Sequence, residues 1–113
     1  MTQLDIIRSR MTTDANRISI EHEIPLDVAK AMLRDTVIMV LCAMDAEANE
    51  HLAKAQTIKE NYADVWLLLA EPLGIKAKVE SIIEDCLDAA QGHIHLLVEG
   101  ARAHQNPSNT PSS

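Results

Sequence analysis

The residues best suited to metal or acid–base chemistry are the histidines and a cluster formed by Glu47, Glu50 and His51. A di-iron helical bundle needs Glu-x-x-His, but Ala48 stands three residues before His51. An inverted zinc-protease motif, His-x-x-Glu-His, needs a histidine where Glu47 stands. Glu47 and His51 are one helical turn apart, which favours a solvated pair on a helix surface over a metal site.

The remaining histidines and the two cysteines fit structural positions better than catalytic ones. His93 and His95 are two residues apart and would share a metal only if Gly92 unwound the helix. His93 falls on an apolar stripe, which is typical of a hydrogen-bonded core histidine. Cys42 and Cys86 lie among apolar neighbours, and this favours buried free thiols in a reducing compartment.

The motifs of nucleophilic catalysis and phosphate binding do not occur in this sequence. It contains neither Gly-x-Ser-x-Gly nor a glycine-rich phosphate loop. We therefore expect no enzymatic activity, no cofactor and no metal. The alternative from this class is a small metal-binding helical bundle that uses His51, His93 and carboxylates.

Composition determines which elements can position these residues. A chain of 113 residues forms one small domain, and 47% of its residues are hydrophobic with no Phe and three Gly. The hydrophobic core of this domain must therefore be built from aliphatic residues, Met and Ala. This composition favours an all-α fold. The net charge of −7 excludes direct nucleic-acid binding. The longest apolar run, residues 37–44, is shorter than the ~20 residues that span a membrane, so we expect a cytoplasmic protein.

The chain divides into three parts. Residues 1–17 have weak periodicity and predict a mobile N-terminal arm. Residues 18–104 predict a helical domain of three to four helices. Residues 105–113 are polar, contain two prolines and predict a disordered tail.

The spacing of apolar residues, together with prolines, glycines and a capping box, predicts the elements inside the domain. Apolar residues alternate over 18–24, which predicts an extended lead-in. Pro25 suits the first turn of a helix, and a capping box from Thr57 to Glu60 predicts the start of another. Pro72 and Gly74 end that second helix, and Gly92 favours a break in the third. The predicted helices cover 26–56, 57–71 and 75–104.

The first of these helices is apolar on all sides for about two turns. Its core stripe consists of Leu33, Val37, Val40 and Met44. Ile38, Met39 and Cys42 lie on the opposite side, where a surface helix is normally polar. A central helix in the small domain, or a homodimer interface, would account for this second apolar side, and Ile38, Met39 and Cys42 are the candidate residues of that interface.

The second predicted helix supplies the candidate residues for partner binding. Trp66 is a residue type enriched at binding hot spots, although its stripe position favours the core. Leu67 and Leu68 stand near the acidic border of the helix and are candidates for exposed anchors.

The segment Ile24-Pro25-Leu26-Asp27-Val28-Ala29, which opens the long apolar helix, gives the chain a family resemblance. In layout, residues 18–100 resemble the QslA-like small helical antiactivators of LuxR-type quorum-sensing receptors. The resemblance implies a dimer that binds the ligand-binding domain of such a receptor. It also implies that binding prevents receptor dimerisation and hence DNA binding.

We therefore expect a protein-binding regulator that masks the oligomerisation surface of a partner. Apolar burial would supply the affinity, and the acidic charge would direct the chain toward a basic rim. The alternative among binding proteins is a chaperone- or anti-host-type module that sequesters one cognate protein.

Overall fold

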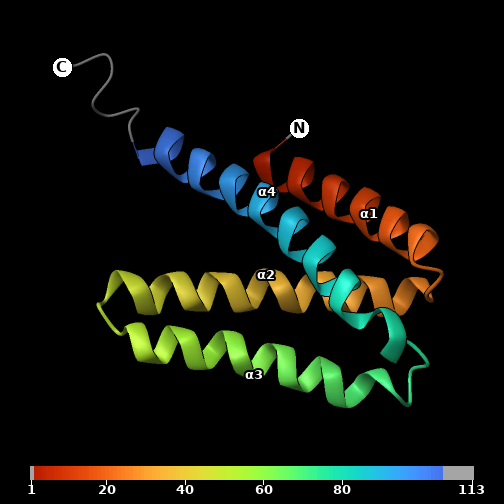
Figure 1. The fold of residues 1–113 in the computed structure, drawn as a ribbon. Coiled ribbons are helices and arrows are strands. Elements are labelled where there is room, and N and C mark those ends of the chain that lie inside the picture. Colours follow the sequence, from red (N-terminus) through yellow and green to blue (C-terminus); the bar gives the residue numbers. More distant parts are fainter. Residues whose placement is uncertain (1, 106–113) are drawn as a thin grey trace, which may run out of the picture.

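A computed structural model describes residues 2–105, and for residues 3, 4, 97 and 100–105 it describes the backbone alone (Figure 1). In this range the elements are α1 (Gln3–Glu21), α2 (Leu26–Ala48), α3 (Leu52–Ala70), the short 3-10 helix η1 (Lys76–Lys78) and α4 (Val79–Gln105). The described residues contain no strand, so the predicted all-α helical bundle is confirmed.

The expected mobile arm over 1–17 and the extended lead-in over 18–24 are wrong, because α1 occupies most of both. Thr2 caps this helix: its Oγ1 accepts a hydrogen bond from Asp5 N at 3.1 Å, and Asp5 Oδ2 accepts one from Thr2 N at 3.3 Å. This reciprocal pair is a capping box. The buried stripe that holds α1 in place follows a helical period, namely Ile7, Ala15 and Ile18 with Met11 half-buried.

The alternation that suggested a strand comes from a helix end followed by a turn. Ile18 is buried on the helical stripe, whereas Ile20 is 77% exposed. Glu23 takes a left-handed conformation with φ of +54°, which reverses the chain and returns Ile24 to the core.

The long helix predicted over 26–56 is two helices, and the second begins earlier than Thr57. Its predicted start after Pro25 is correct. The break follows Ala48, where Asn49 Nδ2 donates to Asp45 O at 2.8 Å and Glu50 takes a φ of +61°. Thr57 then lies inside α3, and its hydroxyl donates to Ala53 O at 3.0 Å.

The C-terminal helix runs without interruption through Gly92, so the break expected there is wrong. η1 occupies residues 76–78 and α4 follows it directly. Gln105, predicted as the first residue of the tail, is the last residue of α4. The rest of the predicted tail, 106–113, lies outside the described residues.

The four helices converge at one end of the molecule. In Figure 1, α2 and α3 lie side by side and antiparallel, α1 lies along α4, and α4 diverges from α2 toward its own C-terminus. The buried cluster sits at the converging end and includes Ile18, Met32, Leu33, Trp66, Val79 and Ile82. The Cα atoms span 15 Å along the shortest axis, so the molecule is thin and its α2–α3 pair cannot be covered on both sides.

The left-handed Glu50 gives a direct test of the α2–α3 connection. A residue with a Cβ is strained at positive φ, so Glu50→Gly is expected to raise the free energy of unfolding by about 0.5–1 kcal/mol. The matched control Glu60→Gly, at an exposed helical position of α3, is expected to lower it by about 1 kcal/mol. Urea denaturation measures both, and a destabilised Glu50→Gly variant would contradict the structure at this turn.

Candidate functional site

The first candidate site is an apolar groove along the contact between α2 and α3, which we call the seam groove. Its larger part has a volume of about 430 Å³ and is lined by Asp35, Ile38, Met39, Cys42, Ile58, Asn61, Tyr62, Val65 and Trp66. It continues into a hollow of about 400 Å³ lined by Leu41, Cys42, Asp45, Ala46, Lys54 and Ile58. All of these residues belong to α2 or α3, so neither α1 nor α4 covers the groove.

Helical spacing on two antiparallel helices creates this groove. Ile38 and Cys42 are one turn apart on α2, and Ile58 and Val65 are two turns apart on α3, so each pair lies on one face. Small buried side chains bring the two helices close at their connected end, namely Ala43, Ala46 and Ala55. The groove therefore has an apolar floor and exposed apolar sides.

The predicted dimer-interface residues all line the seam groove, but they differ in exposure. Ile38 is 52% exposed and Cys42 is exposed, whereas Met39 is 7% exposed and belongs to the floor. The expectation that Cys42 is buried is therefore wrong, and the expectation for Cys86 is confirmed.

The three predicted partner-binding residues differ in their exposure and in the side of α3 on which they lie. Trp66 is 5% exposed and packs in the main core, with its edge in the groove floor, so it is not an exposed anchor. Leu68 is 78% exposed and follows Val65 by three residues, which places it at the groove edge. Leu67 is also exposed, but it lies one turn beyond Ala63 on the other side of α3.

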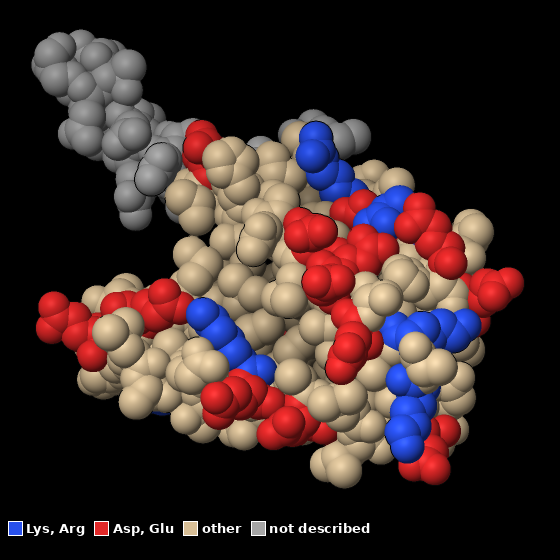
Figure 2. All heavy atoms as spheres, viewed as in Figure 1, with Lys and Arg blue, Asp and Glu red and all other residues tan. Residues whose placement is uncertain are grey.

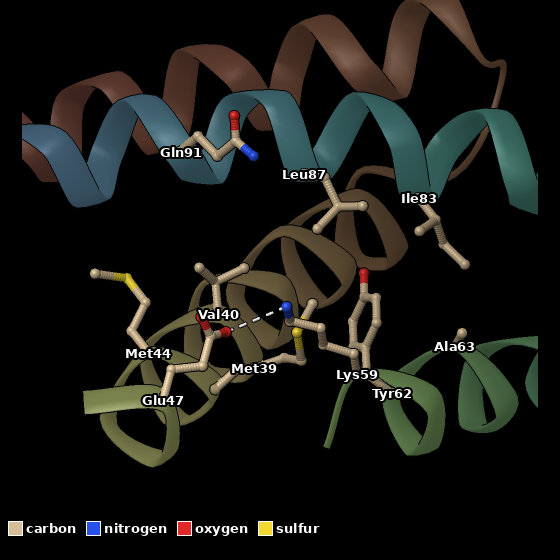
Figure 3. Close-up of a pocket in the computed structure, with 11 residues that line it drawn as sticks. Met39, Val40, Met44, Glu47, Lys59, Tyr62, Ala63, Ile83, Leu87 and Gln91 are labelled. Atoms are coloured by element: carbon tan, nitrogen blue, oxygen red, sulfur yellow. Dashed lines mark ion pairs between the residues drawn. The ribbon is translucent and has the colours of Figure 1, made fainter. Parts of the chain in front are cut away.

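A second hollow, which we call the cleft, lies between α4 and the α2–α3 pair. Its volume is about 350 Å³, and its lining consists of Met39, Val40, Ala43, Met44, Glu47, Lys59, Tyr62, Ala63, Ile83, Leu87 and Gln91. Figure 3 shows Leu87 and Ile83 projecting from α4 toward Tyr62. The Lys59 side chain lies between Tyr62 and Glu47. Lys59 Nζ lies 3.2 Å from Glu47 Oε1, so this ion pair closes part of an otherwise apolar space.

Met39 and Tyr62 form the wall between the seam groove and the cleft, since both line each hollow. The buried Thr36 hydroxyl donates to Met32 O at 2.6 Å, so the Tyr62 hydroxyl donates to Thr36 Oγ1. Burial raises the pKa of Tyr62 to about 12, which keeps the phenol protonated. This chain of hydrogen bonds holds the Tyr62 side of the wall in one position.

The sequence predicts roles other than lining a cleft for several of these residues. Val40 and Met44 belong to the predicted core stripe, but Met44 is 43% exposed because α4 has diverged from it. Glu47 pairs with Lys59 on α3 and not with His51. Leu87 lies one turn after Ile83 and one turn before Gln91, and this spacing is the signal in the sequence that could have identified the α4 side of the cleft.

A polar clasp joins α1 to α4 near the converging end. The Arg17 guanidinium donates two hydrogen bonds of 3.0 Å to the Asp85 carboxylate, and His22 Nε2 lies 3.0 Å from Asp85 Oδ2. The hydrogen bonds from Arg17 are the main reason that the pKa of Asp85 is lowered. Lys78 Nζ also donates to His22 O at 2.5 Å, which ties the turn after α1 to η1, directly before α4.

The clasp includes the one described group of acids and histidine close enough to hold a metal, formed by Glu21, His22 and Asp85. Arg17 already supplies a cation to two of these carboxylates, Glu21 and Asp85, which makes the group a poor metal site. The alternative metal site from His51 and His93 is not formed. His51 lies at the α2–α3 connection, whereas His93 is buried with its Nε2 3.0 Å from Asp14 Oδ2 on α1.

His93 therefore occupies the core, as predicted, but the predicted hydrogen bond is not made. Its approach to Asp14 has the distance of an ion pair, while neither ring nitrogen meets the angles of a hydrogen bond.

Comparisons of the chain with protein-family models, with curated proteins and with solved structures found no match. Among the described residues, none of the helices combines the length and the apolar character needed to cross a membrane.

The two cysteines are expected to react at very different rates. Burial raises the pKa of Cys86 to about 12, whereas Cys42 is exposed in the seam groove. Under conditions in which the native chain is monomeric, a disulfide reagent at neutral pH should modify one thiol rapidly and the second at least about a hundredfold more slowly, since its exposure needs local opening. Cys42→Ser should remove the fast phase, and a fast phase that survives would contradict this assignment.

The Asp85 clasp is expected to make stability depend on pH in a defined direction. Because the folded-state pKa is lowered, the clasp stabilises the fold above the unfolded pKa and is lost as the pH falls through the lowered value. Asp85→Asn should cost about 1–2 kcal/mol at pH 7, and the difference from the unmodified chain should shrink below about pH 4. Denaturant unfolding across pH measures it, with the exposed Asp88→Asn as control. A difference that stays constant at acid pH would contradict the role of the carboxylate.

Proposed function

We propose that this chain is a protein-binding regulator that masks the oligomerisation surface of a partner protein. The seam groove is the observation that carries the proposal. It exposes Ile38, Leu41, Val65 and Leu68 around an apolar floor, and no other described element covers it. Monomeric soluble proteins rarely leave apolar patches of this continuity without a binding role.

The size of this face suits a protein partner. Helices of 23 and 19 residues are about 30 Å long and about 10 Å wide, so the pair offers a footprint of about 600 Å². A standard interface buries about 800 Å² on each partner. Exposed leucines at its edge, such as Leu68, extend the surface toward that value.

We propose the same groove for a homodimer when the partner is absent. Asp35 lies at one end of the groove and Lys54 at the other, while Cys42 and Ile58 lie at its centre. A two-fold axis through that centre would bring Lys54 of each copy over Asp35 of the other. In such a two-fold arrangement Lys54 of each copy would offset Asp35 of the other, and the exposed apolar side chains of the two grooves would face one another.

Masking follows from this shared surface. A chain that buries an apolar helix pair against itself can bury the same pair against a partner that also self-associates through helices. Occupation of the partner's surface then excludes the partner's own second copy. The negative charge favours a partner with a basic rim and opposes nucleic acid.

The specific partner that we propose is the ligand-binding domain of a LuxR-type receptor. The resemblance of residues 18–100 to QslA-like antiactivators supports this choice. On this proposal the regulator would block receptor dimerisation and thereby DNA binding.

Substitution in the seam groove tests the dimer. The unmodified chain should behave in light scattering as twice 12.5 kDa at micromolar concentration, and Ile38→Glu with Val65→Lys should behave as one chain. Ile20→Glu, at an isolated exposed isoleucine of α1, is the matched control and should leave the mass unchanged. A single-chain mass for the unmodified protein at every concentration would refute the dimer.

The same variants test partner masking. Mixed with a purified LuxR-type ligand-binding domain, the unmodified chain and Ile20→Glu should convert receptor dimers into a mixed complex. Ile38→Glu with Val65→Lys should leave the receptor dimeric. If the receptor stays dimeric with every variant, the receptor is not the partner; if the groove variant still dissociates it, the groove is not the binding surface.

A further inference from the structure

The cleft lies on the opposite side of the α2–α3 pair from the seam groove and is open where α4 diverges. On α2 it is lined by Met39, Val40, Met44 and Glu47, whereas the seam groove uses Ile38 and Cys42. Figure 3 shows α4 above this space and α2 and α3 below it, with apolar side chains pointing inward from all three. The cleft shares Met39 and Tyr62 with the seam groove, but the rest of its lining and its opening are its own.

We propose that the cleft binds a short, basic amphipathic helix of a partner protein. The proposal does not depend on the seam groove. It concerns a second binding surface that would remain accessible when the seam groove is occupied.

The length of the cleft matches two to three turns of helix. Its lining runs from Met39 to Glu47 on α2 and from Ile83 to Gln91 on α4, so each side covers about 12 Å at 1.5 Å per residue. A helix that places apolar side chains at i, i+4 and i+7 presents its anchors over the same length. Met39 and Met44 can adjust to the shape of such anchors because thioether side chains are flexible.

The charge around the cleft selects a basic occupant. Lys59 is already paired with Glu47, so it offers little to an anion. Glu84 and Asp88 are exposed on α4 beside Leu87, and Glu60 is exposed on α3 beside Lys59. Figure 2 shows acidic side chains over both sides of the hollow. Lysine or arginine residues that flank the apolar anchors of a helix would meet these carboxylates.

Designed peptides of about 15 residues test this proposal with the full chain. One peptide carries leucines at i, i+4 and i+7 with lysine flanks, and its twin carries glutamate flanks. By calorimetry, the lysine peptide should bind at least tenfold more tightly than its twin, and added salt should reduce the difference. Equal binding of the two peptides, or no binding of either, would overturn the proposal.

Variants then locate the binding. Leu87→Gln should weaken the lysine peptide at least tenfold, with helicity checked by circular dichroism. Glu84→Lys with Asp88→Lys changes exposed residues alone and should reverse the preference between the peptides. Ile38→Glu should leave peptide binding unchanged although it acts on the seam groove. The cleft would be refuted as the site if both cleft variants bound the peptides as the unmodified chain does, or if Ile38→Glu abolished binding. Either result is independent of the outcome for the dimer.

Discussion

One buried cluster at one end of the molecule holds all four helices, and the position of this cluster determines the rest of the structure. Ile18 from α1, Leu33 from α2, Trp66 from α3 and Ile82 from α4 meet there. Because the helices are fastened at that end, α4 is free to diverge from α2 toward the other. The clasp of Arg17 and Asp85 reinforces this arrangement, since it fixes α1 against α4 at the fastened end.

The α2–α3 pair consequently has two apolar sides, and other helices of the chain pack against only one of them. The converging halves of α1 and α4 bury part of one side, and the divergence of α4 opens the cleft over the remainder. The opposite side forms the seam groove. With a shortest dimension of 15 Å, the described chain has no further layer to cover that surface. Apolar surface on both sides is the physical basis on which we propose protein binding for this molecule.

The sequence was sufficient for features that depend on neighbouring residues and insufficient for those that depend on packing. Pro25 correctly predicted where α2 begins. The apolar residues on all sides of the helix around Ile38 correctly predicted that α2 has apolar surface on two sides. The turn at Glu50 was missed because it uses a left-handed glutamate in place of glycine or proline. The exposure of Met44 was missed because it follows from the direction of α4, which no local pattern encodes. Thr2 and Asp5 did carry a capping signal for α1, but the alternating isoleucines after it suggested a strand.

The wall between the two hollows has a further consequence. Met39 and Tyr62 line both spaces, and the hydrogen bonds through Thr36 hold the tyrosine in place. A partner in either space would therefore pack against a tyrosine ring that stays in place. Occupation of one space then changes the affinity of the other little, because coupling between two sites requires a shared element that moves. A protein of 113 residues would in this way hold two partners at once.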